Sequence, residues 1–311
     1  MAVSDVKNQK AMSDDQEWRE TEFRSARYEG LETWSSHEIL SALLGGQHQA
    51  LNAVFAALPK LNEAISAAVL RLSNEVGRII YVGAGTSGRL AVLDGIELTP
   101  TFGWPVERLK YLFAGGDAGF SHAIEGAEDD AQAGRAEILA LNPTFDDIVI
   151  GLAASGTTPY TRAAIKAARK AGALTISFAN NPQAPLLNDA EFGILLRSGA
   201  EVLSGSTRLG AGTSQKIALN LFSTTLMIGL NKVHQGYMVD MQASNEKLIL
   251  RAQRMVMEIT GCDLQKATFA LEKSDYHTKL AVLIVQGQDK DEALSALKRH
   301  NGNLAAALSG G

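Results

Sequence analysis

Short β-branched runs alternate with helical segments between about residues 77 and 250, and this alternation constrains the fold most. Strands separated by single helices form parallel sheets, in which right-handed crossovers place helices on both faces. The sequence therefore predicts an α/β fold with a doubly wound parallel sheet. The five runs that we expect to form the strands are "RIIYVGAG", "LKYLFAGG", "DIVIGLAA", "ALTISFAN" and "FGILLRSG".

Two of these runs lead through a loop of glycine and hydroxyl residues into a helix, in "YVGAGTSGRL" and "GLAASGTTPYT". Ligands of open parallel sheets bind at the carboxyl ends of the strands, and free N–H groups at a helix N-terminus hold anions. Helix capping would explain one such loop alone, whereas two in successive units favour a sugar-phosphate site. The residues assigned to binding are Thr86, Ser87, Ser155, Gly156, Thr157 and Thr158.

Neither loop has the pattern of a nucleotide-binding site. The first lacks the acidic residue that holds a ribose about 20 residues later, and the chain has no Gly-Lys-Ser/Thr phosphate loop. The formal net charge is −5 with dispersed cations, so we expect no nucleic-acid partner. The single cysteine, Cys262, excludes an internal disulfide and a multi-cysteine metal site, and we expect neither a metal nor a cofactor.

The rest of the chain suggests three parts. Residues 1–28 are polar and charged without an apolar face, which predicts a flexible arm. Residues 29–254 form the sheet domain, preceded by two apolar helices within about 36–76. Residues 255–311 contain three short helical patterns and predict a small helical domain. The chain starts without an apolar leader and has no run of 18 apolar residues, so we expect a cytoplasmic protein without a membrane span.

Taken together, several segments resemble the family of N-acetylmuramic acid 6-phosphate etherases, lyases built on the sugar isomerase (SIS) fold. They are "YVGAGTSGRLAVLDGIELTPTFG", "HAIEGAED", "GLAASGTTPYTRAA", "GAEVLSGSTRLGAGTSQKIALNLFSTTLMI" and "MVDMQASNEKL". The resemblance implies removal of the D-lactyl ether from carbon 3 of the sugar. The products would be N-acetylglucosamine 6-phosphate and D-lactate, formed during recycling of cell-wall fragments.

The implied elimination requires one base and one acid. In the open-chain aldehyde, the carbon 2 proton lies next to a carbonyl, and its removal gives an enolate that expels the ether oxygen. The resemblance assigns Glu128 to the carbon 2 proton and Glu97 to the lactate oxygen and the added water. Ten helical residues place Glu97 about 15 Å from Ser87, so the helix must end early or the pocket must be shared.

The resemblance also suggests further ligands for the substrate. Arg208 and Lys216 would neutralise phosphate or carboxylate, and Ser206, Thr207 and Asn245 are further candidates for substrate binding. The chain departs from the family pattern at four positions. Leu98 and Thr99 replace a cysteine and a proline, Thr157 replaces an arginine, and Gly210 replaces a lysine.

The family has its pocket at a subunit boundary, and apolar helices in the first third of the chain exceed what one sheet face needs. We therefore expect a homodimer that binds a sugar phosphate. Two other functions remain open on the same fold. An isomerase would move protons between carbons 1 and 2, and a regulator of the glucokinase-regulatory type would sense a sugar phosphate without catalysis.

Overall fold

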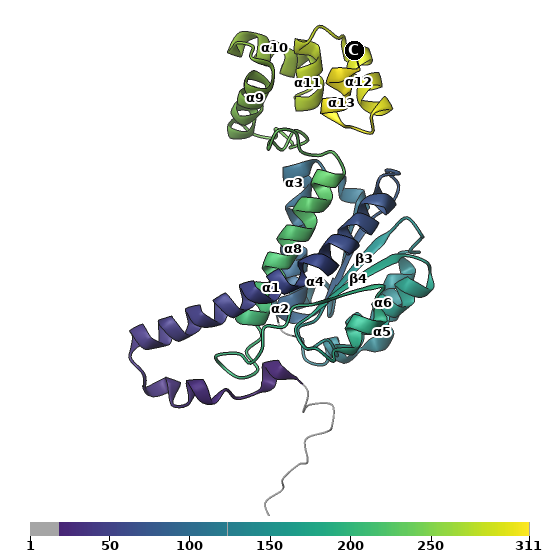
Figure 1. Ribbon diagram of the computed structural model, residues 1–311. Helices are drawn as coiled ribbons and strands as arrows, with labels where there is room; N and C mark the ends of the chain where they lie inside the picture. Colours follow the sequence, from purple (N-terminus) through teal and green to yellow (C-terminus); the bar gives the residue numbers. More distant parts are fainter. Residues whose placement is uncertain (1–18, 123, 311) are drawn as a thin grey trace, which may run out of the picture.

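The computed structural model describes residues 19–122 and 124–310 (Figure 1). Its centre is a five-stranded parallel sheet with the strand order β2-β1-β3-β4-β5. All five runs expected to form strands do so, and the prediction of a doubly wound parallel sheet is confirmed. The strands are β1 (Ile79–Gly83), β2 (Leu109–Phe113), β3 (Ile148–Leu152), β4 (Leu174–Ala179) and β5 (Phe192–Leu195).

Helices cover both faces because side chains alternate along each strand. Ile79 and Tyr81 of β1 join one buried cluster, and Ile80 and Val82 join the other. The first cluster packs against α1 (Ser36–Leu72), α2 (Gly85–Ile96), α3 (Leu98–Phe102) and α8 (Gly210–Gly229). The second packs against α5 (Ala131–Ala140), α6 (Pro159–Lys170) and α7 (Pro185–Asp189), while α4 (Gly116–Ser121) lies beside β2.

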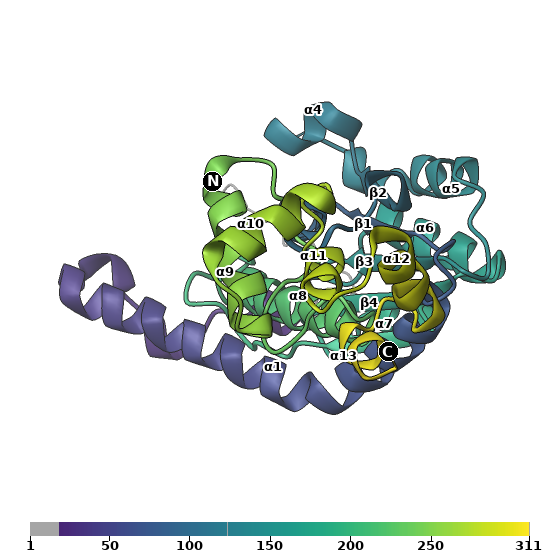
Figure 2. The ribbon, with the colours of Figure 1, turned by 90° about the horizontal axis from the view of Figure 1, so that it is seen from above.

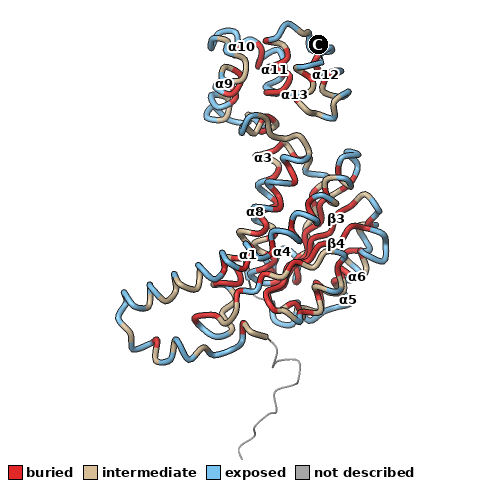
Figure 3. Tube along the Cα trace, in the orientation of Figure 1, coloured by how far each residue is buried: buried red, intermediate tan, exposed pale blue. Residues whose placement is uncertain are grey.

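The first apolar segment forms one helix, and the prediction of two helices within about 36–76 is wrong. Helix α1 begins at a capping box of Ser35 and Glu38 and continues through Pro59. Its buried positions recur every three or four residues from Ala50 to Leu72, and Pro59 faces solvent. Packing on the sheet therefore holds the helix across the proline. Residues 36–49 extend beyond the sheet as an exposed arm (Figures 2 and 3).

By length and composition, α1 is also the one described helix that could cross a membrane, which the sequence did not predict. Nine of its residues are buried within the fold, all in its carboxyl-terminal two thirds. A core helix meets the same criterion of length and hydropathy.

The carboxyl-terminal part has its own core, separate from the sheet (Figure 1). Val239 and Met241 already belong to this core, so the predicted boundary at 255 cuts through α9, and we propose a boundary near 238. The sequence predicted three helices where the structure has five: the third predicted pattern divides into two helices, the second of which is capped by Asn303, and α9 begins before the predicted boundary. They are α9 (Glu246–Thr260), α10 (Leu264–Lys273), α11 (Thr278–Val285), α12 (Lys290–Arg299) and α13 (Leu304–Ser309).

The predicted arm, 1–28, is described only from Arg19 onward, and residues 1–18 lie outside the described part. The segment 19–28 contains two 3-10 turns, η1 (Glu20–Glu22) and η2 (Ala26–Tyr28). Thr21 is fully buried against the sheet domain. This part of the chain is therefore docked on the body, contrary to the expected flexible arm. The other 3-10 turns are η3 (Leu31–Thr33), η4 (Val106–Arg108) and η5 (Ala127–Asp129).

Candidate functional site

The two glycine and hydroxyl loops meet at one edge of the sheet. From β1 the chain first adds β2 on one side and then crosses to place β3 on the other, so the winding reverses between β1 and β3. A crevice at the carboxyl ends of the strands is expected at such a switch point. A cavity of about 440 Å³ lies there. Its wall consists of Arg19, Glu22, Ala84, Gly85, Thr86, Ser87, Glu128, Asp129, Ala153, Ala154, Ser155, Thr157, Thr158, Pro159 and Thr207.

The first loop is held by close backbone packing between β1 and α2. A Cβ on Gly83 would lie 2.7 Å from the Gly88 Cα, so only glycine allows the helix to start this near the strand. Ala84 precedes α2 and provides no side-chain cap. The first N–H groups of α2 are therefore available to an anion beside Thr86 and Ser87.

The second loop has the same construction at the end of β3. The Ser155 Oγ accepts hydrogen bonds from the Thr157 backbone N–H and Oγ1, both at 3.2 Å. Thr158 precedes α6 without capping it, and Pro159 occupies the first turn. Gly156 is buried behind the loop with φ +70°, where it positions the loop without forming part of the cavity wall. Both loops thus direct hydroxyl groups and uncapped helix N-termini towards one cavity.

Two neighbouring carboxylates, Glu128 and Asp129, form the acidic side of the cavity. They belong to the 3-10 turn η5 rather than to an α-helix, and Glu128 is solvent-exposed. The next residue, Asp130, caps α5 by accepting a hydrogen bond from the Ala133 N–H at 2.8 Å. Of the three consecutive acidic residues 128–130, the first two therefore line the cavity and the third is a structural cap.

Glu97 is not part of this cavity. It is exposed at the junction of α2 and α3, at the far end of α2 from Ser87. Two apolar residues on the same part of α2, Leu93 and Ile96, are 47% and 52% exposed. Within one chain, the structure keeps Glu97 and Glu128 apart.

The other predicted ligands also lie off the cavity wall. Arg208 is exposed, and Ser206 belongs to the turn before α8, where its carbonyl accepts the Leu209 N–H. Asn245 caps α9, since its Oδ1 accepts the Leu248 N–H at 3.0 Å. Thr207, the exception among them, does reach the cavity.

Lys216 belongs to a polar network between α2 and α8. Its Nζ donates to the Asn220 Oδ1 at 2.7 Å, and the Asn220 amide donates to Asp94 at 2.9 Å. Asp94 also accepts hydrogen bonds from Tyr81 and Ser223. Burial raises the pKa of Asp94, although these hydrogen bonds and the Lys216 charge act in the opposite direction. The network fixes α2, and therefore Glu97, against α8.

The departure from the family pattern at Gly210 has a local explanation. Buried Glu201 accepts hydrogen bonds from the Gly210 and Ala211 N–H groups at 2.9 and 2.8 Å, which caps α8. Burial raises the pKa of this carboxyl, while the two N–H groups lower it. A Cβ on Gly210 would lie 3.1 Å from the Glu201 Oε2. At the other departures, Leu98 is buried in the core between the sheet and its helices. The Thr99 Oγ1 donates to the Trp104 carbonyl at 2.9 Å, and the Thr157 Oγ1 donates to the Ser155 Oγ at 3.2 Å.

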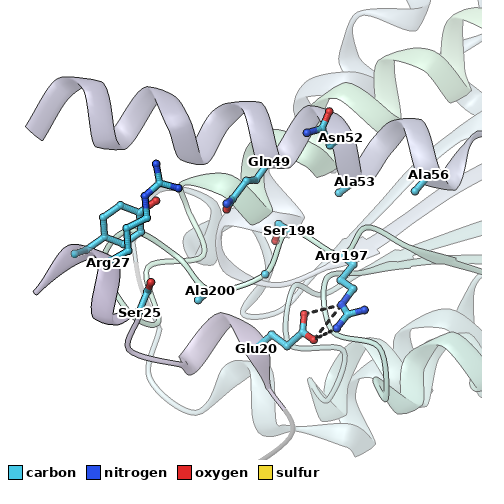
Figure 4. A pocket seen from close by; sticks show the side chains of 12 residues that line it. Glu20, Ser25, Arg27, Gln49, Asn52, Ala53, Ala56, Arg197, Ser198 and Ala200 are labelled. Atoms are coloured by element: carbon cyan, nitrogen blue, oxygen red, sulfur yellow. Dashed lines mark hydrogen bonds and ion pairs between the residues drawn. The ribbon is translucent and has the colours of Figure 1, made fainter. Parts of the chain in front are cut away.

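Three charged residues of the cavity wall were not predicted as site residues from the sequence: Arg19, Glu22 and Asp129. Asp129 adjoins the predicted Glu128, so its position could have suggested it. Arg19 and Glu22 come from the segment expected to be flexible, and no local pattern marks them. A larger cavity of about 540 Å³, between α1 and the amino-terminal segment, contains none of the predicted residues (Figure 4).

Comparisons with known proteins give consistent matches. The glucokinase regulatory protein N-terminal SIS domain matches residues 60–169, a range that includes both loops. The N-acetylmuramic acid 6-phosphate etherase of Deinococcus radiodurans is 47% identical over 94% of this chain and 96% of that protein. The protein of that name from Erwinia tasmaniensis is 45% identical over 90% and 92%. A phosphoheptose isomerase from Francisella tularensis is 20% identical over 63% of this chain and 98% of its own, with a TM-score of 0.45.

Proposed function

The chain belongs to the family of N-acetylmuramic acid 6-phosphate etherases, and from this premise we propose that it cleaves the D-lactyl ether of N-acetylmuramic acid 6-phosphate. The products are N-acetylglucosamine 6-phosphate and D-lactate. The observation that carries the proposal is the cavity at the switch point, where two hydroxyl loops face the carboxylate of Glu128. We place the reaction in cytoplasmic recycling of cell-wall fragments.

The two loops bind the phosphate group. Their hydroxyl and N–H donors reach phosphate oxygens without a metal, and the N-termini of α2 and α6 add a favourable dipole. Ser155 and Thr158 supply hydroxyl donors from the second loop, and Thr86 and Ser87 supply them from the first. The sugar then extends from the loops towards η5.

Glu128 acts as the base. It removes the carbon 2 proton of the open-chain aldehyde, and the electron pair forms an enolate with the neighbouring carbonyl. The enolate then expels the carbon 3 oxygen, which leaves as lactate with a proton from Glu97. Water adds to carbon 3 of the unsaturated aldehyde, and a proton returns to carbon 2. The overall reaction, elimination followed by addition, consumes one water and needs neither oxidant nor reductant.

Glu97 acts on the cavity of a second copy of the chain in a homodimer. Its separation from Glu128 within one chain and the exposed Leu93 and Ile96 beside it support this arrangement. The arm of α1 adds apolar surface, with Leu40 65% and Leu44 59% exposed. A symmetric pair would cover these side chains and combine acid and base at each of two equivalent sites.

Turnover in deuterated, heavy-oxygen water tests the reaction. The proposal requires release of lactate without heavy oxygen and a sugar with deuterium on carbon 2 and heavy oxygen on carbon 3. An isomerase would exchange the carbon 2 proton without releasing lactate, and a regulator would do neither. Heavy oxygen in the lactate, with none on carbon 3 of the sugar, would contradict elimination.

A pair of matched variants tests the base. Glu128→Gln should abolish lactate release and leave binding of N-acetylglucosamine 6-phosphate nearly unchanged. Glu125→Gln changes a carboxylate that is also exposed but lies off the cavity wall, and it should retain activity. Normal turnover by Glu128→Gln would refute the assignment of the base.

Mixed dimers test whether the site is shared. Glu97→Gln and Glu128→Gln should each be inactive, but a mixed dimer has one site with both glutamates intact. Equal amounts that exchange subunits freely should recover about a quarter of the wild-type activity, because half the dimers are mixed and each has one working site. No recovery in demonstrably mixed dimers, or sedimentation as a monomer at micromolar concentration, would exclude the shared site.

A further inference from the structure

The amino-terminal segment 19–22 crosses the rim of the cavity and is anchored there by a buried threonine. The Thr21 N–H donates to the Asn181 Oδ1 at 3.3 Å, and its Oγ1 accepts from the Asn181 Nδ2 at 3.2 Å. The same amide donates to the Ala154 carbonyl at 3.0 Å. Asn181 therefore joins the segment directly to the backbone of the second loop. Thr21 and Asn181 are both fully buried, so the joint is part of the core.

Further contacts hold the segment on either side of Thr21. Glu20 accepts hydrogen bonds from the Arg197 Nε at 3.0 Å and from its Nη2 at 2.5 Å (Figure 4). On the other side, the Ser204 Oγ donates to the Glu22 carbonyl at 2.6 Å, and the Gly205 N–H donates to the Thr21 carbonyl at 2.9 Å. The segment is thus fixed between β5 and the loop that leads to α8. This anchoring positions Arg19 and Glu22 in the cavity wall.

The charges of the wall give Arg19 a specific role. Among the described residues that line the cavity, three are carboxylates, Glu22, Glu128 and Asp129, and Arg19 is the single cation. The substrate of the proposed function carries a phosphate and a carboxylate. Hydroxyl and backbone donors leave this charge unbalanced, whereas a guanidinium supplies several donors together with a positive charge.

We infer that Arg19 binds the phosphate group of the substrate, and that the segment 19–22 is a wall of the phosphate site. The link from Thr21 through Asn181 to Ala154 favours the phosphate over the lactyl carboxylate, because it connects the segment to the loop that carries Ser155 and Thr158. The inference rests on the proposed function for the identity of the substrate. It predicts that binding energy depends on a residue more than 130 positions before the loop it serves.

Arg19→Gln tests the inference, with Arg24→Gln as the matched control. Arg24 lies two residues after the segment 19–22, but its side chain is 75% exposed, pairs with Glu29 and is not part of the wall. Arg19→Gln should raise KM about 10- to 100-fold, with a smaller change in kcat. It should raise the inhibition constant of inorganic phosphate and the Kd of N-acetylglucosamine 6-phosphate in the same range. Arg19→Lys should recover part of the loss, and Arg24→Gln should behave like wild type.

The outcomes separate this inference from the proposed function. If the wild-type protein releases no lactate, the proposed function fails. Phosphate binding by Arg19→Gln and by the control Arg24→Gln still tests the role of Arg19. If Arg19→Gln binds phosphate and N-acetylglucosamine 6-phosphate like wild type, the inference is wrong, even if its KM for the muramic substrate rises. Thr21→Val, which removes the acceptor of Asn181, provides a second test should Arg19→Gln fold poorly. It should weaken phosphate binding, and unchanged binding in a folded Thr21→Val would refute the role of the segment.

Discussion

Gly156 allows a direct test of how packing behind the second loop sets the geometry of the site. Its φ is +70°, a region that side-chain-bearing residues rarely occupy. A Cβ there would lie 2.2 Å from the Ala184 Cβ and 3.1 Å from the Ala179 Cβ. Ala184 is 1% exposed and Ala179 is fully buried, so neither can move aside into solvent. Gly156→Ala therefore combines backbone strain with a steric conflict.

The two contributions can be estimated separately. Left-handed backbone costs a residue such as alanine about 1–2 kcal/mol. Overpacking of a rigid core adds about 1–3 kcal/mol. Ordinary contacts begin near 3.4 Å, so the loop or Ala184 must move by roughly 1 Å. A displacement of that size at a binding loop can reduce kcat/KM about 100-fold.

Gly199→Ala is the control, because Gly199 has a φ of +72° and no atom within 4 Å of the added Cβ. Urea unfolding should give a loss of about 2–5 kcal/mol for Gly156→Ala and about 1–2 kcal/mol for Gly199→Ala. Only the first variant should lose affinity for phosphate. Equal losses of stability, or normal kinetics in Gly156→Ala, would refute the argument that this contact holds the loop.

Three further predictions concern hydroxyl groups and buried carboxylates. Ser155→Ala and Thr158→Val should each raise KM through loss of about 1.5–3 kcal/mol from a charged partner, with little change in kcat, and an unchanged KM would remove that hydroxyl from the site. Burial raises the pKa of Asp147, but hydrogen bonds from Arg78 and Thr144 outweigh this effect and leave the pKa below its usual value. The stability that Asp147 contributes is thus present above the unfolded pKa and is lost as pH falls through the folded pKa. Arg78→Gln should make melting temperatures measured from pH 5 to pH 2 fall less steeply, and a profile like that of the wild type would contradict this prediction. Asp94 behaves in the opposite way, since burial raises its pKa: stability should fall as pH rises from the unfolded pKa through the folded one, and Asp94→Asn should abolish this slope.

The sheet could be predicted from the sequence because each strand carries its own local signal. A buried parallel strand needs apolar residues on both faces, and runs such as Ile79–Gly83 and Ile148–Leu152 contain nothing else. The course of α1 could not be read in this way. Pro59 is a local break signal, but the buried positions of α1 continue past it, and contacts with the sheet determine the result.

The position of the two glycine and hydroxyl loops at one cavity was predictable for a similar reason. Each lies beside its own strand, and strand order brings them together without any further information. Arg19 and Glu22 have no such signal. Thr21 contacts its partner Asn181, which lies 160 positions later in the chain. In the sequence, nothing distinguishes this buried threonine from the exposed polar residues around it. Only the folded chain reveals that Arg19 and Glu22 line the cavity.

Glu97 marks the limit of inference from one chain. The length of α2 already places it about 15 Å from Ser87, and the structure keeps that separation because α2 remains helical to Ile96. Bending the helix would disrupt the network of Asp94, which is 3% exposed and bound by Tyr81, Asn220 and Ser223. Glu97 therefore cannot reach the cavity of its own chain without disrupting this network. In the proposed dimer, Glu97 instead enters the site of a second copy, and the exposed Leu93 and Ile96 beside it would be covered there. Recovery of activity in mixed dimers is therefore the decisive measurement.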